Sequence, residues 1–209
     1  KDVSIDMFAG PSELMVIADN TANSSFIAAD LLSQAEHGGD SQVFLISTSE
    51  DLAVKCREEV INQLENLPRK RELEGALLKS RIIVVRSIMD AVEIANVYAP
   101  EHLIVAAENP WEIVNNVYSA GSIFIGNYSP ESAGDYASGT NHTLPTGGWA
   151  RSKGRVTTDS FCRSFTIQEI TKIGLQGLSD TIQTMAKSEG LDAHANAVKI
   201  RMEENCNED

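Results

Sequence analysis

The sequence predicts an α/β fold, in which a mostly parallel sheet is flanked by helices and followed by a helical appendage. Val- and Ile-rich apolar runs alternate with segments of helical periodicity, which is typical of a parallel sheet. After Asp159 these runs stop and the pattern becomes helical. With 209 residues, 42% of them hydrophobic, the chain can bury a core. Strands are expected at Leu14–Ala18, Val43–Ile46, Ile82–Val85, Leu103–Ala107 and Ile123–Ile125.

Two helices are expected between the first three strands. The first covers Ser24–Ala35, because Asn23 or the serine after it can cap a segment with one broad apolar face. The second opens after Ser49 and ends before Pro68, with apolar side chains four residues apart. One of these is Cys56, which we therefore expect in the core.

The remainder of the chain combines one more helix start, a long loop and the appendage. Asn109 and Pro110 have the cap and first-turn proline of a helix that should end at Gly121. Residues Asn127–Arg155 form a polar, glycine-rich stretch much longer than the usual loop of about 4–6 residues, and such loops are often functional. Helices of the appendage are expected at Phe161–Ile173, Leu178–Lys187 and Asp192–Glu204.

Charge and composition exclude several classes of partner. The formal net charge of −13 argues against binding to nucleic acid or to an anionic membrane. No apolar run approaches the roughly 20 residues needed to cross a bilayer. The three cysteines are scattered without a C-x-x-C pair, so we expect free thiols in the cytoplasm. Because Val3–Asp6 resembles an interior strand and no initiator methionine precedes it, we expect that the chain begins inside a larger gene product.

Each of the four histidines has a carboxylate or carboxamide close in sequence, a pattern that suggests metal binding or proton transfer. His37 lies at the end of the first helix, and Gln34 is three residues before it on nearly the same face. The two side chains can therefore converge on one point. From chemistry alone, a zinc site would combine His37 with a carboxylate rather than with an amide. The carboxylates considered are Asp30, Glu36 and Asp135.

Glu101 and His102 are candidates for proton transfer. They lie where a helix ends and a strand begins, and we expect Pro100 to hold Ala99 extended and so to fix their direction. An adjacent acid and imidazole can divide the work, one activating water and the other carrying a proton. A solvated turn is the alternative for this pair.

The polar segment Ser129–His142 concentrates two acids, several hydroxyl groups and an imidazole after the last strand. Open α/β sheets bind ligands beyond the carboxyl ends of their strands, so we expect a site at that edge. A flexible loop would not need so many potential ligands.

Five ordered motifs resemble the histidinol dehydrogenase family, and the resemblance covers the chain essentially from end to end. They are S-I-D-M-F-A-G-P-S-E (4–13), D-L-L-S-Q-A-E-H-G (30–38), A-P-E-H-L-I (99–104), S-P-E-S-A-G-D-Y-A-S-G-T-N-H-T-L-P-T (129–146) and E-G-L-D-A-H-A-N-A-V (189–198). Members of this family oxidise L-histidinol to L-histidine through L-histidinaldehyde and reduce two NAD molecules in turn. The family enzyme is about twice as long as this chain, so the resemblance is to its C-terminal half.

The resemblance implies a zinc site and several residue roles. Glu101 would activate the water that attacks the aldehyde, and His102 would act as base in the hydride-transfer steps. The zinc would bind and orient the substrate as a template. Its ligands would be Gln34, His37, Asp135 and His194. Substrate contacts would include these ligands and His102, together with Ser12, His142 and Glu189.

The resemblance also implies an arrangement of domains and chains. Residues 1–156 would be an incomplete Rossmann-like domain that carries most of the zinc and substrate site, and residues 157–209 a helical appendage and tail. The tail would reach the partner subunit of a homodimer and complete its site. We find no G-x-G-x-x-G between a strand and a helix, and the resemblance implies that most NAD contacts lie outside this chain. The alternatives are a metal-dependent hydrolase with Glu101 as base, and a non-catalytic remnant that dimerises through its tail.

Overall fold

A computed structural model describes residues 9–203, which form two compact units that meet in sequence between Cys162 and Arg163. The strand expected at residues 3–6 lies outside the described residues. The first unit contains one five-stranded sheet in the order β3-β2-β1-β4-β5, and every neighbouring pair is parallel. Its strands are β1 (Glu13–Ala18), β2 (Gln42–Ser47), β3 (Arg81–Val84), β4 (His102–Ala106) and β5 (Ser122–Ile125). The predicted α/β class and all five predicted strands within residues 9–203 are confirmed.

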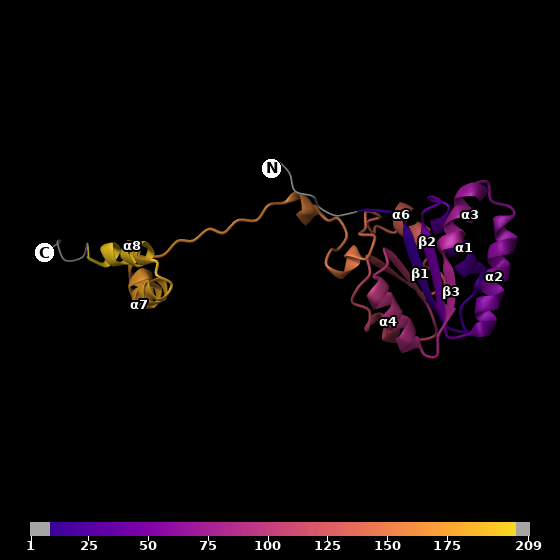
Figure 1. The fold of residues 1–209 in the computed structure, drawn as a ribbon, viewed down its shortest axis with the longest axis horizontal. Helices are drawn as coiled ribbons and strands as arrows, with labels where there is room; N and C mark the ends of the chain where they lie inside the picture. Colours follow the sequence, from indigo (N-terminus) through magenta and orange to yellow (C-terminus); the bar gives the residue numbers. More distant parts are fainter. Residues whose placement is uncertain (1–8, 204–209) are drawn as a thin grey trace. The chain divides into compact units, whose positions relative to one another are not determined.

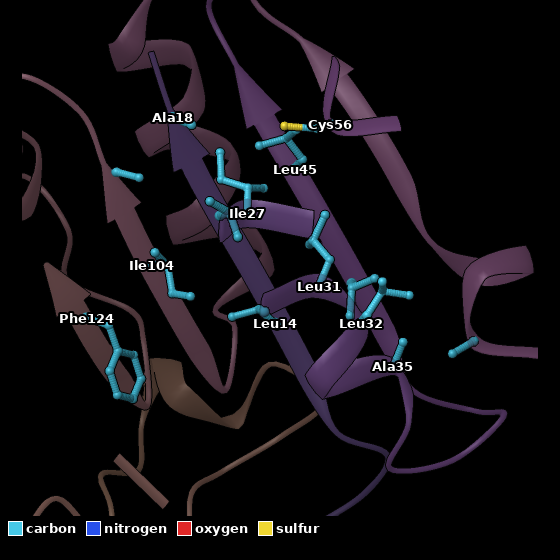
Figure 2. Packing of buried hydrophobic residues seen from close by; sticks show 14 of the residues in the cluster. Leu14, Ala18, Ile27, Leu31, Leu32, Ala35, Leu45, Cys56, Ile104 and Phe124 are labelled. Carbon is cyan, nitrogen blue, oxygen red and sulfur yellow. The ribbon is translucent and has the colours of Figure 1, made fainter. Parts of the chain in front are cut away.

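Helices cover both faces of this sheet (Figure 1). One face packs against α1 (Ser24–Ala35), α2 (Glu50–Leu64) and α3 (Lys70–Lys79), and the other against α4 (Ile88–Tyr98) and α5 (Pro110–Val114). Figure 2 shows the first of these cores, in which Leu14 of β1 and Ile104 of β4 lie beneath α1. Met15 points to the opposite core, because successive strand residues face opposite sides. Burial on both faces explains why β1 and β4 are continuous apolar runs.

The starts of α1 and α2 follow the predicted caps, whereas Asn109 precedes α5 without a side-chain cap hydrogen bond. Asn23 accepts hydrogen bonds from the backbone N–H groups of Ser25 and Phe26 at the start of α1, and Ser49 accepts one from Leu52 at the start of α2. The predicted core position of Cys56 is confirmed, since this side chain is fully buried.

Three predictions about the second half differ from the structure. The helix that begins at Pro110 ends at Val114 and not at Gly121, because the Asn116 side chain bonds the Glu112 carbonyl oxygen and terminates it. The loop after Gly126 contains two short helices, α6 (Glu131–Tyr136) and η1 (Trp149–Arg151). The helix predicted at Phe161–Ile173 is wrong: after the 3-10 turn η2 (Thr158–Phe161), the chain is irregular up to Thr171.

The second unit contains the helices α7 (Lys172–Ser188) and α8 (Asp192–Glu203), which pack against each other. Their positions confirm the last two predicted helices, although α7 begins six residues before the predicted start at Leu178. Of the helices within residues 9–203, none has the length and apolar character that crossing a membrane requires.

Candidate active site

Glu101 and His102 lie at the amino end of β4, directly after α4. The expectation that Ala99 is extended is wrong, because Ala99 adopts the left-handed conformation (φ 57, ψ 65) and its N–H bonds the Ala95 carbonyl at 2.7 Å. A left-handed residue ends a helix while satisfying its last carbonyl groups, and that gain outweighs the cost of a Cβ in this region. The chain then turns directly into β4, where His102 pairs in register with Leu14 of β1.

Glu13, the first residue of β1, holds both of these side chains. The Glu13 N–H donates to Oε2 of Glu101 at 2.9 Å, and the Glu13 carbonyl oxygen lies 3.2 Å from Nδ1 of His102. A carbonyl oxygen only accepts, so Nδ1 of His102 carries the proton and Nε2 keeps its lone pair. Glu101 and His102 are 7% and 3% exposed, so the pair is shielded from bulk water.

Two carboxylates of α6 approach the free nitrogen of His102. Oε1 of Glu131 lies 3.9 Å from Nε2 of His102, and Oδ1 of Asp135 lies 4.0 Å from it. They share a helix face because they are four residues apart. Gly134 allows this approach, because a Cβ there would lie 2.6 Å from the Phe124 ring, on which His102 also packs.

Burial and mutual contact shift the pKa values of these groups. Burial and the hydrogen bond with Asp135 raise the pKa of Glu131 to about 7. Burial would lower the pKa of His102, but the hydrogen bond and charge of Glu101 and the charge of Glu131 outweigh it, so the pKa is raised. Glu131 therefore exchanges its proton near neutral pH, beside an imidazole whose pKa its neighbours raise.

Three buried polar atoms of this region have no hydrogen-bond partner among the described residues: Oε1 of Gln34, Nε2 of His102 and Oε1 of Glu131. Leaving a buried polar atom unpaired costs about 1–3 kcal/mol, and two of these atoms, Nε2 of His102 and Oε1 of Glu131, lie 3.9 Å apart, which indicates that a ligand pairs with them. Ser33, the residue before Gln34, donates its hydroxyl to Oε2 of Glu131 at 3.4 Å. One nitrogen and two carboxylate oxygens, from His102, Glu131 and Asp135, lie within 4.8 Å of one another, a donor set that fits a divalent metal ion.

The other predicted site residues are distributed as follows. His37 is exposed just beyond α1, with Nδ1 3.2 Å from the Ser33 carbonyl oxygen. Ser12 directly precedes β1, and His142 is exposed in the loop after α6. Glu189 and His194 are exposed in the second unit, at the end of α7 and the start of α8. Their roles stay predictions.

The cluster lies at the amino ends of the strands, so the expectation of a site beyond the carboxyl ends is wrong. Glu13 and His102 begin β1 and β4, and α1 runs back to this edge and ends there. The sequence reasoning assigned no role to Glu13 or Glu131. Glu13 could have been found as a carboxylate at the start of an otherwise apolar strand. Glu131 could have been found from its spacing of four residues from Asp135.

Comparison with known proteins identifies the family. Residues 1–202 match the family model described as histidinol dehydrogenase. The histidinol dehydrogenase of Bacteroides thetaiotaomicron is 54% identical over 202 residues, which cover 97% of this chain and 47% of the relative. That of Campylobacter jejuni is 52% identical over 200 residues, covering 96% and 47%. The crystal structure of histidinol dehydrogenase from Elizabethkingia anophelis superposes with a TM-score of 0.95 at 54% identity, covering 98% of this chain and 47% of that chain. The chain thus spans about half the length of the relatives it matches, and it belongs to the histidinol dehydrogenase family.

Proposed function

We propose that this chain supplies the zinc- and substrate-binding half of a cytoplasmic enzyme that oxidises L-histidinol to L-histidine with two molecules of NAD. The observation that carries the proposal is the buried Glu101–His102 pair, whose free Nε2 faces two carboxylates. Family membership supplies the reaction. We expect most NAD contacts to lie outside this chain.

Four residues would hold the zinc: Gln34, His37, Asp135 and His194. Support comes from the buried and unpaired Oε1 of Gln34, and from Ser33, which joins the end of α1 to α6. When bound, the zinc supplies a Lewis-acidic template that orients the substrate. Ser12, His142 and Glu189 would contact the substrate around it.

His102 takes the proton in both oxidations. Nε2 accepts the proton of the substrate hydroxyl as the carbon-bound hydrogen leaves as hydride to NAD, which gives the aldehyde. In the second oxidation it accepts a hydroxyl proton of the hydrated aldehyde in the same way, which gives the carboxylic acid, and ionisation of this acid to the carboxylate releases the third proton. The Glu13 carbonyl supports this role because it keeps the protonated Nδ1 turned away from the substrate.

Glu101 acts between the two oxidations. Its carboxylate takes a proton from water as the water oxygen attacks the aldehyde carbon, and it returns this proton to the former carbonyl oxygen, so that the hydrate forms. Each turnover consumes one water and two NAD and releases two NADH and three protons. Burial of Glu101 restricts this step to water that enters the site.

His102 would not bind the metal itself, although it lies in the cluster with Glu131 and Asp135. An imidazole whose Nε2 is bound to zinc has no lone pair for a proton, and Nδ1 already donates to Glu13. Glu131 instead neutralises the charge that His102 gains, from 3.9 Å away.

We further propose a homodimer in which the tail of one copy completes the site of the other. Within the second unit, large apolar side chains are exposed, including Ile173 at 80% and Met185 at 59%. Phe165 and Ile167, in the segment before α7, are exposed by 75% and 86%. Such surfaces are usually covered by a partner.

Calorimetric titration of L-histidinol tests the proposal, with zinc present and after chelation. It is made with this chain alone and with a chimera in which the chain replaces the matching 47% of the B. thetaiotaomicron relative. We expect zinc-dependent binding and NAD reduction by the chimera. A chimera that folds and holds zinc, yet neither binds nor oxidises histidinol, would refute the proposal.

A further inference from the structure

We propose that Glu13 is a positioning residue, which holds the Glu101–His102 pair in its reactive geometry and ties it to the loop around Gly147. The inference rests on the proposed function and deepens it. Glu13 does not contact Nε2 of His102, the atom proposed to react, and it acts through Glu101 and His102.

The backbone of Glu13 contacts both members of the pair at once. Its N–H fixes one oxygen of Glu101 at 2.9 Å, and its carbonyl oxygen fixes Nδ1 of His102 at 3.2 Å. A displacement of this one residue therefore moves the base that activates water and the base that accepts the hydroxyl proton. Catalytic groups must be held to within about 0.5 Å of their productive geometry.

The side chain of Glu13 holds that backbone in place. Oε2 accepts the Glu101 N–H at 3.4 Å, which completes a reciprocal pair of contacts between the two residues. Oε1 accepts the Gly147 N–H at 2.9 Å and links β1 to a loop 134 residues away. Gly147 has a positive φ of 62, so the turn that aims this N–H at Glu13 favours glycine.

The carboxylate form of Glu13 is what these contacts require. Two backbone donors converge on it, one on each oxygen, and a glutamine offers only one oxygen beside an NH₂ group that cannot accept. Burial raises the pKa of Glu13, while the Gly147 and Glu101 N–H groups oppose that rise. Glu13→Gln thus keeps the size of the side chain and breaks one of the two contacts.

Glu13 also lines an open cavity of about 800 Å³, together with Glu93, Tyr98 and Arg151. The cavity provides a path by which a small carboxylate in solution can reach the space left by a truncated side chain. Glu93 is an exposed carboxylate on the wall of the same cavity, without a hydrogen bond or ion pair to the pair of bases among the described residues. Glu93→Gln is therefore a matched control, which removes the same charge from the same cavity.

The test compares Glu13→Gln, Glu13→Ala and Glu93→Gln in the chimera. We measure zinc content, KM for histidinol, and kcat for the oxidation of histidinol and of histidinaldehyde. For Glu13→Gln we expect kcat to fall about tenfold or more in both oxidations, with KM and zinc content within about twofold of the parent. Glu93→Gln should behave as the parent. Acetate should partly restore kcat of Glu13→Ala and leave Glu13→Gln unchanged, because only the alanine leaves room for it.

Three results would overturn the inference. One is a parental kcat for Glu13→Gln. Another is a loss of kcat that matches the loss of zinc or of folded protein in both variants, since Glu13 would then only stabilise the sheet edge. The third is a Glu13→Ala variant that folds but does not respond to acetate. An inactive parent chimera would instead count against the proposed function, so the two failures are distinguishable.

Discussion

Gly121→Ala should displace Glu101 without changing any group that is proposed to take part in the reaction. A Cβ on Gly121 would lie 2.5 Å from the carbonyl oxygen of Glu101 and 3.3 Å from its carbonyl carbon. Both are backbone atoms, so no rotation of a side chain can relieve the clash. The same stretch is held by hydrogen bonds from Gly121 N–H to Pro100 at 3.0 Å and from Ser122 N–H to Glu101 at 2.9 Å.

The expected loss of kcat follows from how far the new Cβ and the Glu101 carbonyl oxygen must move apart. Real Cβ atoms essentially never approach closer than 3.0 Å, so the distance between this Cβ and the Glu101 carbonyl oxygen must open by at least 0.5 Å, and we expect Glu101 to take up much of that shift. A misplacement of about 1 Å costs about a hundredfold in rate, so half that shift costs about tenfold in kcat for histidinaldehyde oxidation. Overpacking of this kind also lowers the free energy of unfolding by about 1–3 kcal/mol.

Both effects are measured in the chimera, by steady-state kinetics with histidinaldehyde and by urea denaturation. Gly154→Ala is the matched control, because no atom lies within 4 Å of a Cβ at that position. A Gly121→Ala variant with parental kcat at full zinc occupancy would show that the Glu101 backbone can shift without consequence. The assignment of Glu101 as the base that activates water would then fail.

Three further predictions concern single side chains. Glu101→Gln should slow histidinaldehyde oxidation at least about tenfold more than the first oxidation, because an amide cannot activate water; equal losses in separately measured half-reactions would contradict this role. His194→Asn should lower the zinc content, whereas His102→Asn should retain zinc and slow both oxidations. If elemental analysis instead showed that His102→Asn loses zinc and His194→Asn retains it, the cluster of His102, Glu131 and Asp135 would be favoured as the metal site. Asp30 has a pKa raised by burial to about 7, so the folded state holds its proton more tightly than the unfolded state. Its contribution to stability is present below about pH 4 and lost as the pH rises through 7, and Asp30→Asn should therefore be about 1–2 kcal/mol more stable than the parent at pH 8. Parallel unfolding curves for both proteins between pH 5 and 8 would contradict that shift.

The strands and the long helices could be predicted because their local signals agree with their environment. β1 and β4 are buried on both faces and therefore read as uninterrupted apolar runs. Helix α1 has an asparagine cap and a broad apolar face. By contrast, α6 is six residues long and its buried residues include Glu131 and Gly134, so the sequence has no apolar stripe that would predict this helix. Gly134 of this helix packs closely against the Phe124 ring, a tertiary contact that a sequence pattern does not contain.

The helix prediction for Phe161–Ile173, the segment before α7, was wrong for a different reason. Its apolar residues were sufficient in number to suggest a helix, but Phe165 and Ile167 alternate with Ser164 and Thr166, which is the period of an extended chain. All four side chains are exposed, so no contact within the described residues overrides this pattern.

The position of the site follows from the parallel register, and the sequence contained enough to find half of it. In a parallel sheet the amino ends of neighbouring strands lie side by side, so the residues that begin β1 and β4 meet once the pairing of Leu14 with His102 is known. That pairing places Glu13 beside Glu101, 88 positions later in the chain. The usual preference for the carboxyl edge concerns ligands bound by loops and helix N-termini, which supply N–H groups for anions. A site for a metal and for proton transfer needs side-chain oxygens and nitrogens instead, and at the amino edge the end of α1 and the face of α6 bring them to the first residues of two strands.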